Sequence, residues 1–342
     1  MAPQQALAEI PYADIRGGTP LDLFNHFPER ARYLTHASME MFGPARHVVR
    51  SLGLPLGDRV SKAWLEKSEN PYLDEIRAIA DALGINGAYF LNVCFEWGCT
   101  SGAFRTRDGA ALRRVLDWPF PTLGENVIVA HQSGVAGDFY NITWSGLSGM
   151  FQGMAPGRFA AAINQAPMRE HDNGFVGDWI RNRIIARGTH ALPPAHLLRQ
   201  VFETASSYTE ARERLCTVPV AVPAIFILSG IADDEGCIIE RTERTFGMRE
   251  MAGDRVCATN HFETLPGGRW LARPIDSAGR VRAAHALTCE QVERRFSWFV
   301  PPIANVNSRL VVNASAGRGE LSVLGTAGCF PTTEVFSWPQ VA

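Results

Sequence analysis

Residues 98–118 read GCTSGAFRTRDGAALRRVLDW, and this stretch decides how the rest of the chain is interpreted. Two β-like runs lie on either side of Asp108-Gly109, a pair typical of a hairpin turn. Cys99 starts the first run, and Arg114 and Asp117 lie on the second. The stretch therefore predicts two neighbouring strands that carry a thiol, a guanidinium and a carboxylate.

Cys99 gains a base of its own if the peptide bond between Gly98 and Cys99 is cut. The new chain end then carries a thiol and an α-amino group, whose ordinary pKa of about 7.7–8.0 suits a general base. The thiol still needs a cationic or hydrogen-bonding neighbour to form a thiolate near neutral pH, and Arg114 is the candidate. Asp117 can hold the new amine. Taken alone, Cys99 would instead be a small core residue, and Arg114 with Asp117 an ion pair at a strand end.

The sequence alone does not determine the register of the two runs, and therefore not the distance between Arg114 and Cys99. A two-residue Asp108-Gly109 turn places Arg114 opposite Ala103, about 13 Å along the strand from Cys99. Contact then requires that the side chain reaches back, that a bulge intervenes, or that the turn has three residues centred on Arg107.

The composition of the 342-residue chain is that of an ordinary globular protein, with 46% hydrophobic and 20% charged residues. The formal net charge of −2 and the pI near 6.5 give no basic excess, so we expect no nucleic-acid partner. Residues 1–18 lack the pattern of a secretory signal, which predicts a cytoplasmic location. The longest apolar run, residues 218–228, is far below the roughly 20 residues that span a bilayer, so no transmembrane segment is expected.

The spacing of the metal-ligating residue types predicts neither a metal site nor a cofactor. The nine histidines form no H-E-x-x-H pattern, and the seven cysteines form no C-x-x-C pair. Nucleotide-binding glycine motifs and the G-x-S-x-G motif of serine hydrolases are also missing. Apart from Cys99, we expect most of the cysteines to be small core residues. They are Cys94, Cys216, Cys237, Cys257, Cys289 and Cys329.

The chain changes character at Cys99. Residues 1–98 show helical periodicity, interrupted by prolines, with one clear helix that ends at Gly84. After Cys99 come short strands, then helices over about residues 176–215, then strands again, and a further helix over residues 282–296. Blocks of this kind fit a layered α+β domain better than an alternating βαβ fold.

Six blocks follow one another in an order that resembles the N-terminal-nucleophile (Ntn) cysteine hydrolases. That family includes acid ceramidase, N-acylethanolamine acid amidase, the penicillin and bile-salt acylases and the isopenicillin N acyltransferase group. The first block is the Gly-Cys-Thr-Ser start of the hairpin with its Arg-x-x-Asp segment at residues 114–117. The other five blocks are residues 146–164, 223–230, 236–241, 259–262 and 276–280. The resemblance covers most of the chain after Cys99.

The resemblance implies a four-layer αββα sandwich, in which two antiparallel sheets lie between helical layers. It implies self-cleavage at Gly98–Cys99, which divides the chain into residues 1–98, a helical pro-region or α-subunit, and residues 99–342, the catalytic domain or β-subunit. The first fragment is expected to stay associated as a subunit. A homo-oligomer is left open.

Carried over by position, the resemblance implies a role for each of five residues. Cys99 is the nucleophile, Arg114 contacts its sulfur, and Asp117 orients the new ammonium. Asn260 donates a hydrogen bond to the oxyanion. In other enzymes, removal of one such donor lowers the rate on the order of a hundredfold. Arg280 braces Asp117 or meets the substrate.

Gln165 departs from the family pattern, because ceramidase-like members carry an acid at this position. Arg280 thereby loses one possible counterion. Asn164, the residue before Gln165, is the alternative candidate for the polar group that matters here. We count Asn164 and Gln165 as candidate substrate-binding residues. Trp118 and Trp144 are candidates for lining an acyl site, although such aromatic residues more commonly belong to the core.

The resemblance implies an enzyme that hydrolyses a linear, non-peptide amide bond of a small N-acyl compound through a thioester. A substrate with an apolar acyl arm is favoured. Two alternatives stay open on the same fold. One is an acyltransferase that passes the acyl group to an amine or thiol, and the other is an unprocessed binding protein without catalysis.

Overall fold

The computed structural model of the chain describes residues 7–93, 97–120, 122–265, 267–271 and 275–339. Its α-helices are α1 (Pro20–His26), α2 (Pro28–Ala37), α3 (Arg46–Val48), α4 (Leu54–Lys67), α5 (Leu73–Leu83), α6 (Ala88–Asn92), α7 (Gly174–Arg187), α8 (Pro194–Thr204), α9 (Tyr208–Thr217), α10 (Ser277–His285) and α11 (Cys289–Glu293). Short 3₁₀ turns occupy Ser38–Ala45 and Gly124–Asn126, and a π-helical turn occupies Val49–Gly53.

The strands form two large sheets and one small one. The eight-stranded sheet has the order β1 (Tyr12–Asp14), β4 (Ile128–Gly134), β5 (Gly137–Thr143), β6 (Gln152–Ala155), β7 (Phe159–Gln165), β9 (Ala224–Ser229), β10 (Gly236–Arg241) and β11 (Phe246–Glu250). The seven-stranded sheet has the order β12 (Arg255–Ala258), β2 (Gly98–Thr106), β3 (Gly109–Asp117), β14 (Ser308–Ser315), β15 (Glu320–Ala327) and β16 (Phe330–Pro331), with β17 (Phe336–Trp338) also on β15. The small sheet pairs β8 (Met168–Arg169) with β13 (Trp270–Leu271).

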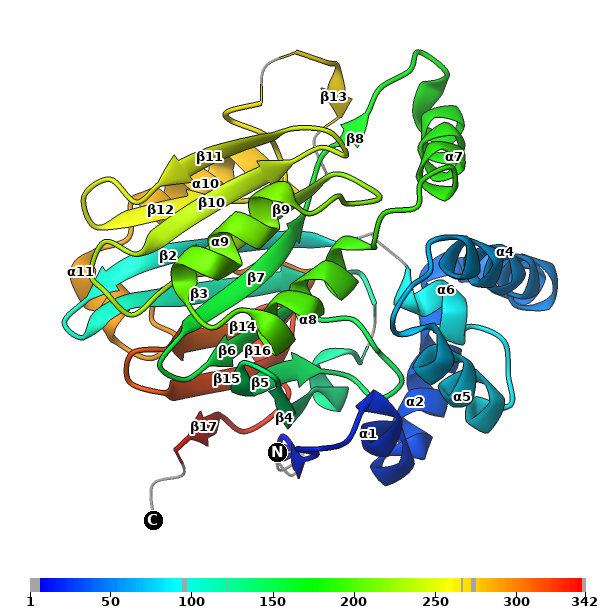
Figure 1. Ribbon diagram of the computed structural model, residues 1–342, viewed down its shortest axis with the longest axis horizontal. Helices are drawn as coiled ribbons and strands as arrows, with labels where there is room; N and C mark the ends of the chain where they lie inside the picture. The colour runs from blue at the N-terminus through cyan, green and yellow to red at the C-terminus, as the bar shows by residue number, and fades with distance from the viewer. Residues whose placement is uncertain (1–6, 94–96, 121, 266, 272–274, 340–342) are drawn as a thin grey trace, which may run out of the picture.

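The two large sheets lie face to face, and helices cover the outer face of each one (Figure 1). α8 and α9 pack on the eight-stranded sheet, whereas α10 and α11 pack on β2 and β12 of the other. All pairings within the two large sheets are antiparallel except that of β1 with β4. The expected α+β fold with four αββα layers is therefore confirmed.

β2 and β3 form the expected hairpin, but the turn lies one residue earlier than predicted. Thr106 pairs with Gly109, so Arg107 and Asp108 form the turn. Gly109 follows the turn with a φ of +101°. A side chain there would also meet the backbone, because a Cβ would lie 2.2 Å from the carbonyl oxygen of Ile231. The glycine is thus required beside the turn rather than inside it.

The corrected register brings Arg114 within reach of Cys99. Arg114 lies opposite Ser101 rather than opposite Ala103. Because side chains alternate along a strand, Cys99, Ser101 and Arg114 share the face of the sheet that looks toward β7. A long side chain spans the diagonal between such positions, so neither a bulge nor a three-residue turn is needed.

The described residues before β2 form a helical group at one end of the sandwich and also contribute the strand β1 (Figure 1). β1 runs parallel to β4 at the edge of the eight-stranded sheet, a pairing that the sequence did not predict. Tyr12 of this strand stacks on Trp338 near the other end of the chain. The helix expected to end at Gly84 is α5, and Gly84 adopts a left-handed conformation at its end. The segment is therefore joined to the sandwich by a sheet edge as well as by side chains.

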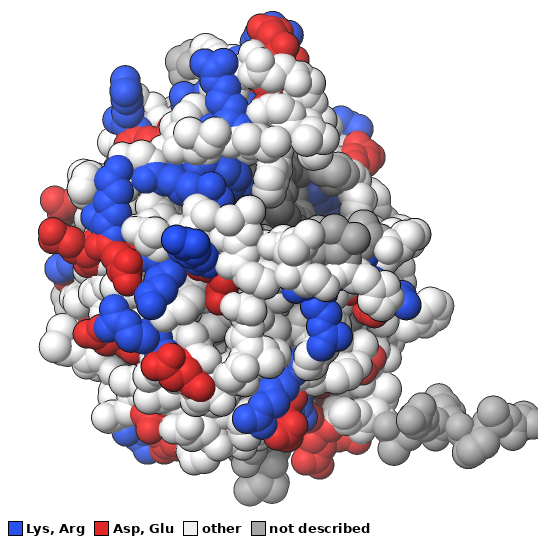
Figure 2. Space-filling model, turned by 90° about the vertical axis from the view of Figure 1, so that its right-hand side faces the viewer, with Lys and Arg blue, Asp and Glu red and all other residues white. Residues whose placement is uncertain are grey.

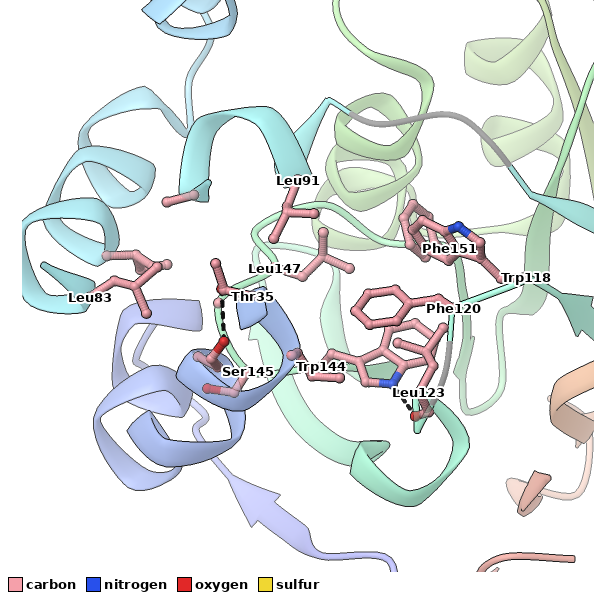
Figure 3. A pocket seen from close by; sticks show the side chains of 15 residues that line it. Thr35, Leu83, Leu91, Trp118, Phe120, Leu123, Trp144, Ser145, Leu147 and Phe151 are labelled. Carbon is pink, nitrogen blue, oxygen red and sulfur yellow. Dashed lines mark hydrogen bonds between the residues drawn. The ribbon is translucent and has the colours of Figure 1, made fainter. Parts of the chain in front are cut away.

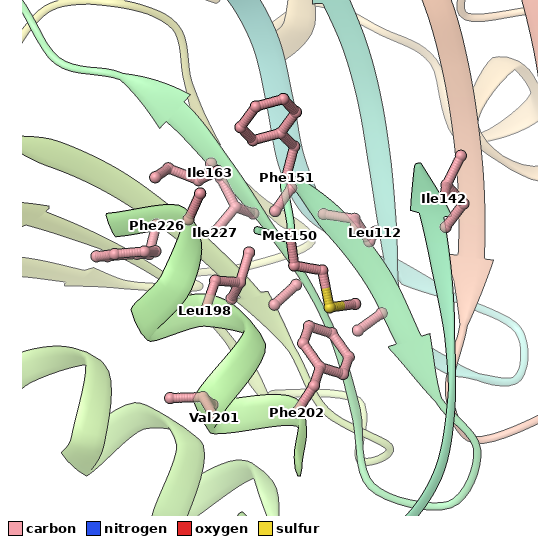
Figure 4. Close-up of a cluster of buried hydrophobic side chains, with 14 of the residues drawn as sticks. Leu112, Ile142, Met150, Phe151, Ile163, Leu198, Val201, Phe202, Phe226 and Ile227 are labelled. Carbon is pink, nitrogen blue, oxygen red and sulfur yellow. The ribbon is translucent and has the colours of Figure 1, made fainter. Parts of the chain in front are cut away.

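The main core lies between the two sheets and beneath α8 (Figure 4). Leu112 from β3 lies between the sheets, while Ile163 of β7 and its strand partner Phe226 of β9 face the other side of the eight-stranded sheet, with Leu198 and Phe202 of α8. Each of these side chains is almost completely buried. Burial of one such side chain contributes about 1.5–3 kcal/mol, so this core fixes the strands that carry the site.

The helix expected over residues 282–296 is broken into α10 and α11. Thr288 starts the second helix, because its side chain accepts from the backbone of Gln291 and the Gln291 side chain accepts in return. A threonine that caps one helix cannot lie in the middle of another, and the sequence interpretation overlooked this capping box.

Three of the remaining cysteines are buried as expected, and two are not. Cys216, Cys237 and Cys257 are buried, whereas Cys289 and Cys329 are exposed. Cys94 lies outside the described residues. Within the described residues, no helix is long and apolar enough to cross a membrane. On the face that carries the N-terminal helices, basic and acidic residues are interspersed (Figure 2).

Candidate active site

Cys99 is the second residue of β2 and is fully buried between the two sheets. Its sulfur accepts a hydrogen bond from Arg114 Nη2 at 3.2 Å and lies 3.9 Å from the carbonyl oxygen of Ile163 in β7. Arg114 Nη1 donates to the same carbonyl at 2.8 Å and to Asn164 Oδ1 at 3.0 Å. The facing sheet thus holds the guanidinium with one amino group directed at the sulfur.

Burial raises the pKa of the Cys99 thiol to about 11, because a thiolate would lose its hydration there. The Arg114 guanidinium lowers this pKa but is outweighed by burial, and the Asp117 carboxylate raises it further. In the uncleaved chain the thiol is therefore protonated near neutral pH.

Asp117 ends β3 and lies opposite Gly98, the residue before Cys99. Its Oδ2 accepts from Arg280 Nη1 at 3.2 Å, and its Oδ1 accepts from Ser308 Oγ at 2.7 Å. Burial raises the pKa of this carboxyl, while the Arg280 guanidinium and the Ser308 hydroxyl lower it. Of the two roles expected for Arg280, the geometry shows the bracing of Asp117.

Arg280 also binds the backbone and side chains around the cleavage site. Its Nη1 donates to the carbonyl oxygen of Cys99 and, at 2.9 Å, to Thr100 Oγ1. Its Nη2 donates to Asn260 Oδ1 at 2.9 Å, and its Nε donates to the carbonyl oxygen of Ile275 at 2.8 Å. With these partners the buried guanidinium is a fixed part of the site.

Asn260 follows β12 and is buried against the backbone of Cys99. Its Oδ1 accepts from the Cys99 backbone N–H at 2.8 Å as well as from Arg280. Its Nδ2 donates to the carbonyl oxygen of Gln165 at 2.8 Å. Because donors surround one end of the amide and an acceptor faces the other, the orientation of the side chain is unambiguous. Asn260 thus holds the nitrogen atom that cleavage would release.

Asn164 and Gln165 are the last two residues of β7, and their side chains have different partners. Asn164 is buried, and its Oδ1 accepts from Arg114 and, at 2.7 Å, from Ser101 Oγ. Its Nδ2 donates to two backbone carbonyls at the end of β12. Asn164 therefore braces Arg114 from within the protein. Gln165 Oε1 accepts from the backbone N–H of Trp97 at 2.6 Å, which places Gln165 beside the segment that precedes the cleavage site.

Trp118 and Trp144 line an apolar pocket between the N-terminal helices and the sandwich (Figure 3). It is partly open to solvent and has a cavity volume of about 60 Å³. Leu83 and Leu91 come from the N-terminal segment, while Phe151 comes from the sandwich. The indole nitrogen of Trp144 donates to a backbone carbonyl at 2.8 Å, which fixes that ring in the wall. The pocket suits an apolar group rather than a charged one.

Trp97 connects the cleavage site with this pocket. Its ring centroid lies 5.4 Å from that of Trp118 and 4.6 Å from that of Phe151, and both of these residues line the pocket. Trp97 is buried and stands two residues before Cys99. The chain on the acyl side of the Gly98–Cys99 bond therefore leads from the sulfur toward the pocket.

Sequence reasoning missed two residues of the site, and it singled out Ser101 only as part of the Gly-Cys-Thr-Ser motif, without a role. Ser308 accompanies Asp117, Ser101 accompanies Asn164, and Trp97 links the cleavage site to the pocket. Serines occur throughout the chain, and no spacing marks Ser308. Trp97 was visible beside the Gly-Cys pair, but its ring contacts depend on the packing of three separate segments.

In the part of the chain that the structure describes, no three His, Cys, Asp or Glu side chains gather closely enough to hold a metal ion. The side chains around the Gly98–Cys99 bond offer a thiol from Cys99, two guanidiniums from Arg114 and Arg280, the carboxylate of Asp117 and the carboxamide of Asn260. These groups converge on a single peptide bond.

The curated relatives that are similar to this chain in sequence include an acid ceramidase and an N-acylethanolamine-hydrolyzing acid amidase, while no protein-family model matches it. Acid ceramidase from Bos taurus is 32% identical over 135 residues, which are 39% of this chain and 29% of that protein. N-acylethanolamine-hydrolyzing acid amidase from Mus musculus is 28% identical over 180 residues, which are 50% of this chain and 47% of that protein. The chain thus matches less than half the length of either relative.

A solved structure of the Caenorhabditis elegans N-acylethanolamine-hydrolyzing acid amidase ortholog has a similar fold. Its TM-score is 0.50 at 17% identity, and the match covers 70% of this chain and all of that one. At this identity the likeness shows the fold alone.

The chain therefore has the Ntn-hydrolase fold that the motifs led us to expect. Within that class, the chain is a homologue of acid ceramidase and of N-acylethanolamine-hydrolyzing acid amidase.

Proposed function

We propose that this chain is the precursor of a self-processing N-terminal cysteine amidohydrolase that cleaves the carbon–nitrogen bond of an N-acyl amide. One observation carries the proposal: Cys99 is held at both of its reactive atoms. Arg114 donates to its sulfur, while Asn260 accepts from its backbone nitrogen. A structural cysteine needs neither contact, whereas a residue that becomes nucleophile and base together needs both.

Self-cleavage would begin with attack of the Cys99 sulfur on the carbonyl carbon of Gly98. The carbon–sulfur bond forms, the carbon–nitrogen bond breaks, and the thiol proton is transferred to the departing nitrogen, which becomes the amine. Water then hydrolyses the thioester to give the Gly98 carboxyl group and restores the thiol. Gly98 is partly exposed, so water can reach this bond.

In the processed form, the same atoms would act on an external amide. The amine of Cys99 accepts the thiol proton, and the sulfur attacks the substrate carbonyl carbon. Asn260 Nδ2 and backbone N–H groups stabilise the oxyanion. The amine then protonates the leaving nitrogen, and water resolves the thioester. Asp117 and Arg280 hold the amine end of Cys99 in place through their buried ion pair.

The chain's own acyl side indicates where the acyl arm of a substrate would lie. In the precursor, Gly98 supplies the carbonyl that Cys99 attacks, and Trp97 continues toward the apolar pocket. An external substrate with the same orientation would place its acyl arm along Trp118 and Phe151. A linear amide with an apolar acyl arm fits this pocket, and the names of the two sequence relatives also point to acyl amides.

The N-terminal fragment would stay bound after cleavage. It supplies part of the pocket, and an ion pair and the pairing of β1 with β4 hold it to the sandwich. Arg199 in α8 forms a buried ion pair with Glu75 of α5 at 2.8 Å, and Glu203, also in α8, accepts from Arg199 and from the Tyr72 hydroxyl group. Its guanidinium also lies 4.0 Å from the centre of the Tyr72 ring. These contacts do not involve the cleaved bond.

The proposal is tested by intact-mass spectrometry on the purified chain and its Cys99→Ala variant, followed by assay on N-acyl amides of graded acyl length. We expect two polypeptides and amide hydrolysis from the wild type, and one inert chain from the variant. Addition of amine or thiol acceptors to the assay separates hydrolysis from acyl transfer. A single wild-type chain without activity would support the binding-protein alternative.

A further inference from the structure

Asn260 lies just beyond the end of a strand, where the sheet no longer fixes its backbone. The pairing of β12 with β2 ends at Ala258, opposite Ser101. The backbone N–H of Asn260 donates instead to Ser277 Oγ at 2.9 Å. Ser277 is the first residue of α10, whose first turn also carries Arg280. One helical turn therefore contacts Asn260 at both its backbone and its side-chain oxygen.

Ser277 is itself held by two neighbours of Asn260. Its Oγ lies 2.7 Å from His261 Nδ1 and 2.8 Å from Thr259 Oγ1. Thr259 Oγ1 also donates to the Ser277 carbonyl oxygen at 2.8 Å. Ser277, Thr259 and Asn260 are buried, and His261 is partly buried. Thr259, Asn260 and His261 are thus all within hydrogen-bond distance of the Ser277 hydroxyl group.

With the Thr259 proton on the Ser277 carbonyl, the Ser277 oxygen is free to accept from Asn260 for either tautomer of His261, whose Nδ1 also lies 3.2 Å from Thr259 Oγ1. The Thr259 proton is used by the Ser277 carbonyl, so Thr259 Oγ1 can only accept from the Ser277 hydroxyl. With a bare Nδ1 on His261, Ser277 donates to the imidazole. With a proton on that Nδ1, the imidazole donates to Ser277, and Ser277 donates to Thr259. The support of Asn260 is therefore the same for either tautomer of His261.

We propose that Ser277 and His261 are positioning residues, which fix Asn260 and through it the nitrogen of Cys99. The inference rests on the proposed function and extends it to two residues that contact neither the sulfur nor the cleaved bond. Asn260 Oδ1 lies 2.8 Å from the Cys99 nitrogen, so a shift of the Asn260 backbone moves the group that must hold the amine. Misplacement of reacting groups by about 1 Å costs up to about a hundredfold in rate.

The test compares two pairs of variants in the full-length chain. Ser277→Ala removes the acceptor, whereas Ser277→Thr retains a hydroxyl group. His261→Leu removes the imidazole nitrogen, whereas His261→Asn retains a polar atom at the place of Nδ1. For each variant we would measure the rate of self-cleavage by intact mass, and the kcat and KM of processed protein on a fluorogenic N-acyl aminocoumarin.

We expect Ser277→Ala and His261→Leu to slow self-cleavage and to lower kcat by about tenfold or more, with KM changed less than about twofold. Ser277→Thr and His261→Asn should recover most of both rates. A role in stability alone would instead lower the melting temperature while leaving kcat unchanged. Wild-type rates in Ser277→Ala would overturn the inference. If that variant does not fold, wild-type rates in His261→Leu would overturn it.

Cys99→Ala separates this inference from the proposed function. If Cys99→Ala stays uncleaved while Ser277→Ala is cleaved at the wild-type rate, the positioning role is wrong and the proposed function stands. If Cys99→Ala is itself cleaved efficiently, the proposed function is wrong and the positioning inference falls with it.

Discussion

At the scale of single residues, burial and charge oppose each other at Cys99. Burial raises the thiol pKa to about 11, and the Arg114 guanidinium at 3.2 Å from the sulfur lowers it only in part. Before cleavage the nitrogen of Cys99 is an amide and cannot accept a proton. The precursor therefore depends on the small fraction of thiolate that exists at a given pH.

The rate of self-cleavage should consequently rise with pH. Because the pKa in the folded chain lies above the ordinary thiol value, the protonated form dominates below about pH 11, and the thiolate fraction grows about tenfold for each pH unit below that value. We expect the first-order rate, followed by intact mass from about pH 6 to about pH 9, to increase throughout. A rate that is flat or falls over this range would contradict a thiolate formed by loss of a proton to solvent.

Replacement of Arg114 separates function from stability. Arg114→Met keeps much of the side-chain volume and removes a fully buried cation, whose burial is itself unfavourable. We expect self-cleavage to slow by at least about tenfold, because the sulfur loses its hydrogen-bond donor. The unfolding free energy should fall by no more than about 2 kcal/mol, since only neutral acceptors lose a partner. Chemical denaturation measures the unfolding free energy, and intact mass measures the rate of self-cleavage. Cleavage of Arg114→Met at the wild-type rate would show that Arg114 has no part in the mechanism.

At the scale of elements, the motifs predicted the residues of the site better than the pairing of the strands. The structure brings Cys99, Arg114, Asp117 and Arg280 together, and the roles that the resemblance implies for them stay predictions. The hairpin register came out differently because sequence alone did not show that Gly109 follows the turn. β1 has only three residues, too few for a pattern, and pairs with a strand more than a hundred residues away. Contacts of this kind depend on packing that no local spacing encodes.

Two glycines at equivalent positions of two hairpins test the importance of the register. Gly109 and Gly137 each follow a two-residue turn, with φ of +101° and +109°. A Cβ on Gly137 meets nothing within 4 Å, whereas a Cβ on Gly109 lies 2.2 Å from a backbone oxygen. Gly137→Ala should cost about 1–2 kcal/mol from its backbone conformation, and Gly109→Ala about 2–5 kcal/mol.

Self-cleavage should slow only in Gly109→Ala, because that hairpin carries both Cys99 and Arg114. Thermal denaturation and intact mass of the two variants provide the comparison. Equal effects of the two substitutions on stability and cleavage would show that the register of β2 and β3 does not control the site.

At the scale of the whole molecule, two segments share one pocket and one sheet. The N-terminal segment supplies β1 and several pocket residues, and Arg199 in α8 binds Glu75 of that segment in a buried ion pair. Cleavage removes one covalent bond and leaves all of these contacts. The fragment should therefore behave as a subunit rather than as a leaving peptide.

Arg199→Met should weaken the hold on the cleaved fragment, because it leaves the Glu75 carboxylate buried without its partner, a change that typically costs about 3–5 kcal/mol. Arg212→Met in α9 is the matched control, since its ion pair with Glu250 is largely exposed and is worth at most about 1 kcal/mol. Size-exclusion chromatography of processed protein at decreasing concentration measures the retained fragment. Equal retention in the two variants would contradict the role given to Arg199.

The most direct test of the account is the intact mass of active protein. We predict that every preparation that hydrolyses N-acyl amides contains two polypeptides, the second beginning at Cys99, with masses that sum to that of the whole chain plus one water. Activity should appear in step with cleavage during a time course. A continuous 342-residue chain that hydrolyses N-acyl amides at full rate would contradict the central claim.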